Sequence, residues 1–149
     1  MTDQFDRIRG YIERYDGDDY VSIESGTPAS DGQIAAIVDA MNVTLPQDYR
    51  DFLSEFGTLE IGGIEVAGAA EGHLEVVSMR DELMTQHSLP GDLIPVINED
   101  GDSFVCIDLE GQLVRWQPGG ESFGMDESLG DYLVRLCEEL IEDEGGDVE

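Results

Sequence analysis

Apolar residues recur at spacings of three and four along much of the chain, the pattern of amphipathic helices that bury one face. This pattern predicts helices over about residues 3–15, 30–41 and 46–56. A shorter helix is expected over residues 78–87, and the clearest one covers residues 129–141. The first three helices precede the predicted strands and the last one follows them.

Residues typical of helix ends support these boundaries. Ser30 and Gln33 have the spacing of a capping box. Pro46 suits the first helical position, and Gly57 suits a left-handed position just after the helix. Ser78 is expected to cap the short helix, whose inward residues are Met79, Leu83 and Met84. The apolar face of the helix over residues 46–56 is expected to pack against a sheet, and it consists of Leu45, Tyr49, Phe52, Leu53 and Phe56.

After Gly57 the pattern changes to short extended runs separated by turn residues. Residues 58–61 and 64–67 flank a Gly-Gly pair, which predicts a hairpin. Residues 93–97 and 104–107 flank an Asp-Gly turn and form the strongest hairpin signal in the chain. Residues 113–116 read as the next strand. The predicted fold is α+β, a mostly antiparallel sheet flanked by N-terminal helices and a C-terminal amphipathic helix.

The length indicates one domain over residues 1–142, followed by an acidic tail, expected to be frayed, over residues 143–149. No apolar run approaches the length of a membrane helix, and the N-terminus does not resemble a signal peptide. Cys106 and Cys137 lie in apolar stretches and are expected to be buried free thiols, with a disulfide between them as the less favoured alternative. These features predict a cytoplasmic protein.

The charge is the unusual feature of the composition. Thirty-five acidic residues face seven arginines and no lysine, for a net charge of −28. So acidic a chain repels phosphates, which argues against nucleic acids and anionic membranes as partners. It attracts a basic protein and speeds the encounter. Adaptation of the surface for solubility or salt is the explanation that composition alone favours, and the two explanations are compatible.

The sequence contains no complete pattern typical of catalysis or cofactor binding. His73 and His87 belong to no spaced ligand motif, and no glycine-rich phosphate loop is present. Ser122 lies in a Gly-x-Ser-x-Gly sequence (Gly120–Gly124), but the sequence offers no recognisable general base to pair with it, and a serine nucleophile needs one. The carboxylate-rich turn beginning at Asn98 fails as a calcium loop, because its sixth and twelfth positions are Ser103 and Leu109. We therefore expect no enzymatic activity, metal or cofactor.

Several short motifs, in order and spacing, resemble the SUKH superfamily, which includes the fungal cell-wall-assembly regulator and many bacterial toxin-immunity proteins. The resemblance covers about residues 30–140, and the sequence departs from the family at Phe56, where asparagine is common. The motifs are Leu45-Pro46-Gln47-Asp48-Tyr49 with Phe52-Leu53 and Phe56-Gly57, residues 61–68, 93–96, 101–104, 106–108 and 114–116, and Ser128-Leu129 with Tyr132-Leu133. The residues of the expected signature and core are Leu45, Pro46, Tyr49, Phe52, Leu53, Gly57, Gly101, Phe104 and Trp116.

The resemblance implies an α+β domain without catalytic residues. Bacterial members bind and neutralise a toxin domain, commonly a nuclease or deaminase, and a nuclease carries a basic cleft that an acidic surface complements. We therefore expect an immunity protein that binds a basic toxin, with a regulatory or scaffolding adaptor as the alternative. The residues expected to contact the partner, around the exposed hairpin, are Glu99, Asp100, Asp102, Asp108 and Glu110.

Overall fold

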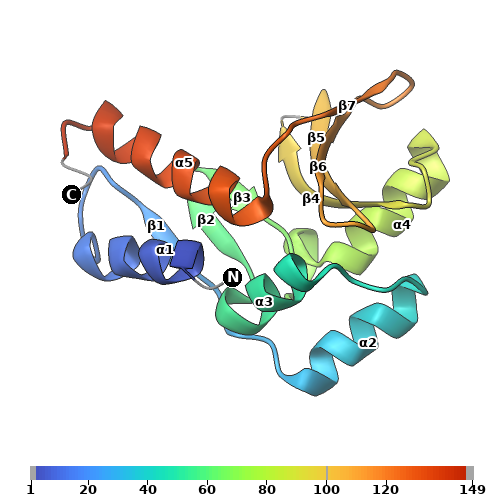
Figure 1. The fold of residues 1–149 in the computed structure, drawn as a ribbon, viewed down its shortest axis with the longest axis horizontal. Coiled ribbons are helices and arrows are strands. Elements are labelled where there is room, and N and C mark those ends of the chain that lie inside the picture. Colours follow the sequence, from blue (N-terminus) through green and yellow to red (C-terminus); the bar gives the residue numbers. More distant parts are fainter. Residues whose placement is uncertain (1–2, 100, 147–149) are drawn as a thin grey trace.

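A seven-stranded antiparallel sheet, in which each strand pairs with the next along the chain, forms the centre of the molecule (Figure 1). The computed structural model describes residues 3–99 and 101–146. The strands are β1 (Ile23–Ser25), β2 (Leu59–Ile61), β3 (Ile64–Val66), β4 (Leu93–Glu99), β5 (Ser103–Asp108), β6 (Leu113–Trp116) and β7 (Ser122–Gly124). The helices are α1 (Asp3–Arg14), α2 (Asp31–Met41), α3 (Gln47–Phe56), the 3-10 helix η1 (Gly72–Leu74), α4 (Val76–His87) and α5 (Leu129–Asp143). The α+β prediction is confirmed.

Alternation along β5 divides the core between the two faces of the sheet. Val105 and Ile107 belong to the main core, together with residues of α1, α2, α3 and α5. Phe104 and Cys106 point to the other face, where they pack with Trp116 and residues of α4. Figure 1 shows the resulting layers, with α1 and α5 side by side and α4 beside the β4–β6 part of the sheet.

Helix α3 packs its aromatic face into the main core, as the sequence predicts. Tyr49, Phe52 and Phe56 are at most 1% exposed. The Tyr49 hydroxyl donates a hydrogen bond of 2.8 Å to the carbonyl oxygen of Ala67, just beyond β3, and the ring of Phe56 meets that of Phe5 edge-on at 5.6 Å. The helix that carries the family signature thus joins α1 to the sheet.

The two ends of α3 differ from the prediction. Pro46 is the residue before the helix, with an extended ψ of 149°, and not its first helical residue. Gly57 has φ 73° and ψ −62°, which is outside the left-handed helical region. Glycine is required there because a Cβ atom would collide with the carbonyl oxygen of Thr27. The close approach of two backbone segments, which the local sequence does not encode, decides this position.

The capping prediction is confirmed for α2 and wrong for α4. Both hydrogen bonds of the box between Ser30 and Gln33 are present. Helix α4 begins two residues before Ser78, and its cap is Glu75, whose carboxylate accepts from the amides of Val77 and Ser78. A carboxylate serves at this position as well as a hydroxyl does, and it also suits the positive end of the helix dipole.

The inward face of α4 also differs from the prediction. Leu83 is buried and Met79 is partly buried, but Met84 is 39% exposed. Arg80 is buried instead, and its guanidinium donates to three backbone carbonyl oxygens. A buried arginine with three acceptors replaces the expected methionine because it ties α4 to two neighbouring segments; the acceptors belong to Met41, Gly91 and Leu93.

The hairpins predicted around residues 62–63 and 98–102 are confirmed, and so is the strand at residues 113–116. Strand β7 was not predicted, because three residues carry too short a pattern to recognise. Cys106 and Cys137 are buried and free, and burial raises the pKa of each thiol to about 12. Within the described residues, no helix is both long and apolar enough to cross a membrane.

Candidate partner-binding surface

The residues expected to contact a partner lie at opposite ends of β5. Glu99 ends β4 and Asp102 lies in the following turn, whereas Asp108 ends β5 and Glu110 lies in the turn to β6. Asp100 lies outside the described residues. The six residues of β5 separate the two turns by about 20 Å. The structure therefore divides the expected site into two regions.

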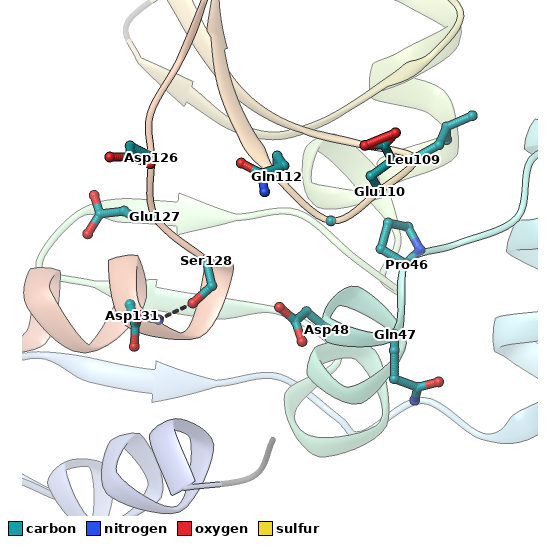
Figure 2. Close-up of a pocket in the computed structure, with 11 residues that line it drawn as sticks. Pro46, Gln47, Asp48, Leu109, Glu110, Gln112, Asp126, Glu127, Ser128 and Asp131 are labelled. Atoms are coloured by element: carbon teal, nitrogen blue, oxygen red, sulfur yellow. Dashed lines mark hydrogen bonds between the residues drawn. The ribbon is translucent and has the colours of Figure 1, made fainter.

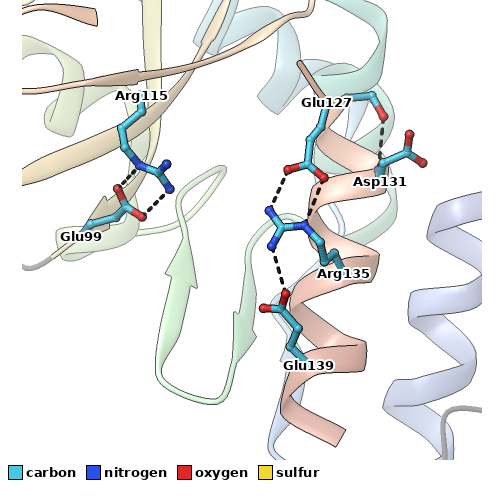
Figure 3. Close-up of polar contacts among 7 residues, drawn as sticks. Glu99, Arg115, Glu127, Asp131, Arg135 and Glu139 are labelled. Atoms are coloured by element: carbon cyan, nitrogen blue, oxygen red, sulfur yellow. Dashed lines mark hydrogen bonds and ion pairs between the residues drawn. The ribbon is translucent and has the colours of Figure 1, made fainter. Parts of the chain in front are cut away.

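At the first end of β5, the tip of the β4–β5 hairpin, Glu99 is bound by an arginine. Nε and Nη2 of Arg115 donate to its two carboxylate oxygens at 2.8 and 3.0 Å (Figure 3). The hydroxyl of Ser103 donates a further bond of 2.7 Å. The hydrogen bond from Arg115 lowers the pKa of Glu99. This carboxylate is compensated within the chain and contributes little charge to a partner.

At the second end, Asp108 holds the β5–β6 turn together. Its carboxylate accepts from the amides of Glu110 and Gln112 at 2.9 and 3.0 Å. The side chain of Glu110 is exposed at the turn. Of these two acidic residues, Asp108 shapes the backbone and Glu110 presents its charge to solvent.

Glu110 lines a groove of about 620 Å³ between the β5–β6 turn and the N-termini of α3 and α5 (Figure 2). Five of its eleven lining residues are acidic and none is basic, so the groove concentrates negative charge. Its apolar part includes Leu109, which is 41% exposed. The lining residues are Pro46, Gln47, Asp48, Leu109, Glu110, Gly111, Gln112, Asp126, Glu127, Ser128 and Asp131.

Local structure places these carboxylates at the groove. Pro46 directly precedes α3, and Asp48 lies in the first turn of that helix. Ser128 caps α5 by accepting from the amide of Asp131, which lies in the first turn of that helix. Acidic residues are favourable in a first turn because the amides of helix N-termini carry partial positive charge. Asp126 has φ 57°, a left-handed conformation that aspartate adopts more easily than most residues.

The five carboxylates differ in how far the chain compensates them. Nε and Nη2 of Arg135 donate hydrogen bonds to the two carboxylate oxygens of Glu127 (Figure 3). Asp131 accepts a hydrogen bond of 2.9 Å from the side-chain amide of Gln4. Within the part of the chain that the structure describes, neither Glu110 nor Asp126 forms an ion pair. Asp48, in the first turn of α3, forms none there either, so carboxylates without an arginine partner face the groove from the β5–β6 turn, from the segment before α5 and from α3.

Most arginines form hydrogen bonds or ion pairs within the chain, and none lines the groove, which is therefore acidic. Arg80 is buried on backbone carbonyl oxygens, and four other arginines pair with carboxylates away from Glu110 and Asp126. The ion pairs are Arg7–Glu138, Arg9–Asp6 and Arg9–Glu55, Arg115–Glu99, and Arg135 with Glu127 and Glu139.

The sequence does not single out the groove. Asp48, Asp126 and Asp131 come from segments up to 83 positions apart (131 − 48), and among 35 acidic residues no local pattern distinguishes them. Among the described residues, no three His, Cys, Asp or Glu side chains are placed to hold a metal ion. The expected absence of catalysis and of cofactors stays a prediction.

Comparison with known proteins identifies relatives by fold and by family. A crystal structure of a protein from Pseudomonas syringae pv. tomato is similar, with a TM-score of 0.64 and 18% sequence identity, over 83% of this chain and 93% of that chain. No curated protein matches the sequence. The SUKH_5 family model, described as SMI1-KNR4 cell-wall, matches residues 8–138. This match spans both the helical signature and the sheet, and the chain therefore belongs to the SUKH superfamily.

Proposed function

We propose that this chain is a non-catalytic protein-binding domain that neutralises a basic toxin, of the nuclease type, by binding it. The observation that carries the proposal is the groove between α3, α5 and the β5–β6 turn, which has five carboxylates and no basic residue. A nuclease binds phosphates through a basic cleft, and this groove is complementary in charge to such a cleft.

The composition of the groove also suits a protein–protein interface. Leu109 supplies exposed apolar surface beside the carboxylates, and apolar contacts in the centre of an interface contribute more to affinity than exposed charges do. Glu110 and Asp126 contribute the steering charge, since neither forms an ion pair with an arginine within the described residues. We propose that the carboxylates speed association and that Leu109 helps to hold the bound partner.

The cell compartment that suits this function is the cytoplasm. Both cysteines are buried free thiols, which fits a reducing compartment. A basic toxin that acts on nucleic acid inside the cell would be met there.

The test is affinity capture from the source organism with the tagged full-length chain, eluted by a salt gradient. We expect a stoichiometric basic protein that elutes at moderate salt, because salt screens the attraction between opposite charges. The recovered protein is then assayed for nucleic-acid cleavage and for toxicity on expression, each with and without this chain. Neutralisation in both assays supports the proposal.

A regulatory or scaffolding adaptor remains the alternative, and the same experiment separates the two functions. An adaptor would recover a partner whose activity does not fall when the chain binds. Failure to recover any basic partner would contradict the toxin proposal and favour solvent adaptation as the reason for the charge of −28. Stability that rises steeply in molar salt would support that explanation.

A further inference from the structure

Strand β7 forms one edge of the sheet, and no further strand of the described chain pairs with it. Its three residues, Ser122–Gly124, are all exposed, and the Phe123 side chain is 51% exposed. An edge strand presents backbone N–H and C=O groups that pair with another strand unless charge, proline or a covering segment prevents it. Strand β7 contains no charged residue and no proline.

The hydrogen bonds to β6 determine which backbone groups face outward. The Met125 amide donates to the carbonyl oxygen of Leu113, and the Gln117 amide donates to that of Glu121. In an antiparallel pair, every second residue is bonded to the neighbouring strand. Phe123 lies midway between Glu121 and Met125, and its backbone groups therefore face β6.

It follows that the N–H and C=O groups of Ser122 and Gly124 face away from the sheet. We propose that this edge pairs with the same edge of a second copy of the chain, antiparallel and centred on Phe123, so that the sheet continues across a two-fold axis. Ser122 then lies opposite Gly124 of the second copy, and the two bonded pairs related by the axis satisfy all the outward groups of both strands.

This register also brings the two Phe123 rings together. The two residues are directly opposite in a non-hydrogen-bonded pair, which places their side chains on the same face and at the shorter of the two cross-strand distances. An aromatic cross-strand pair stabilises a sheet. A ring that is half exposed in the single chain thereby gains a contact in the dimer.

The charges near β7 favour a second copy as the partner. Beside Phe123 lies a hollow of about 360 Å³ that includes Arg115 and Arg135, which pair with Glu99 and Glu127. Two chains of charge −28 repel each other, and this repulsion is smallest where carboxylates are already neutralised. A basic partner, in contrast, is drawn to uncompensated carboxylates.

The register avoids facing like charges, and the other edge of the sheet lacks these features. Glu121 would lie opposite Met125 of the second copy, not opposite its own equivalent. At the other edge, β1 carries the charged Glu24 and turns its Ile23 side chain into the core. Charge on an edge strand is a common protection against pairing. This inference does not depend on the proposed function.

The test is sedimentation equilibrium of the full-length chain over a range of concentrations up to millimolar, in low and in molar salt. We expect a weak, reversible dimer that becomes tighter as salt screens the repulsion between the copies. The salt dependence has the opposite sign from that of toxin capture, so the two proposals fail separately. A chain that stays monomeric under all of these conditions would overturn the inference.

Two further measurements locate the interface. Phe123→Asp places like charges opposite each other and should weaken dimerisation by about tenfold or more. Tyr20→Asp adds the same charge at an aromatic residue that is 74% exposed and outside β7, and should leave dimerisation unchanged. In the unsubstituted chain, the amides of Ser122 and Gly124 should exchange hydrogen more slowly as the concentration rises. A dimer that Phe123→Asp leaves intact, or amides whose exchange does not depend on concentration, would overturn the proposed edge.

Discussion

The two ends of β5 both carry acidic residues, but they differ in whether an arginine neutralises the carboxylates. At the hairpin tip, Arg115 binds both carboxylate oxygens of Glu99. At the other end, Glu110 faces a groove with four more carboxylates and no basic residue. Sequence treats these residues as equivalent, because all of them are acids in turns. The difference teaches that partner binding depends on where charge is left uncompensated and not on where acidic residues are dense.

The largest expected effect is on association with the partner. Glu110→Arg reverses a charge at the groove and should slow association with the captured basic partner by about tenfold at low salt, because steering depends on the local potential. The measurement is the association rate by stopped flow at several salt concentrations. Asp102→Arg makes the same change at the hairpin tip, where we expect less than about a twofold effect. Equal effects would mean that the tip takes part in binding as the groove does.

The next effect is on stability at the tip. Arg115→Met removes the bidentate ion pair with Glu99 but retains most of the aliphatic part of the side chain. It should lower the free energy of unfolding by about 1 kcal/mol. The measurement is urea unfolding at low salt. Asp102→Asn, in the same turn, should change stability by less than about 0.5 kcal/mol. Unchanged stability in Arg115→Met would show that the pair contributes nothing.

In the groove, removal of a charged side chain should raise the free energy of unfolding, whereas Arg115→Met lowers it. Asp126→Asn reduces repulsion among the carboxylates and keeps a residue that tolerates φ 57°. It should raise the free energy of unfolding by about 0.5 kcal/mol at low salt, and this gain should vanish in molar salt. Thermal unfolding at the two salt concentrations measures the effect. A loss of stability would contradict the description of the groove as electrostatically unfavourable.

The smallest expected effect is the dependence of stability on pH in the acidic range. Arg115 lowers the pKa of Glu99 in the folded chain, so this carboxylate stabilises the fold above its unfolded pKa of about 4.3. The contribution is lost as the pH falls through the lowered, folded pKa. The stability difference between the unsubstituted chain and Arg115→Met should therefore shrink as the pH falls below about 4. Urea unfolding across this range measures it, and a constant difference would assign the effect to packing.

Local patterns predict the elements well and the contacts between distant segments poorly. The capping box at Ser30 and the hairpin turn at Gly101 are determined by neighbouring residues, and the structure contains both. Gly57 was predicted to be a helix end, but its conformation depends on Thr27, thirty positions earlier (57 − 27). Arg80 was missed for the same reason, because its three acceptors belong to two other segments.

By itself, the sequence determined the α+β class, the order of the α-helices and of most strands, the SUKH membership and the excess of acidic residues. These properties depend on hydrophobic periodicity, on short motifs and on composition, which are all readable along the chain. Only the tertiary structure decided which carboxylates are compensated by arginine, where the uncompensated ones meet in a groove, and which strand edge remains open. Those properties depend on distances between residues far apart in the chain, and charge interactions fall steeply with distance in water and salt.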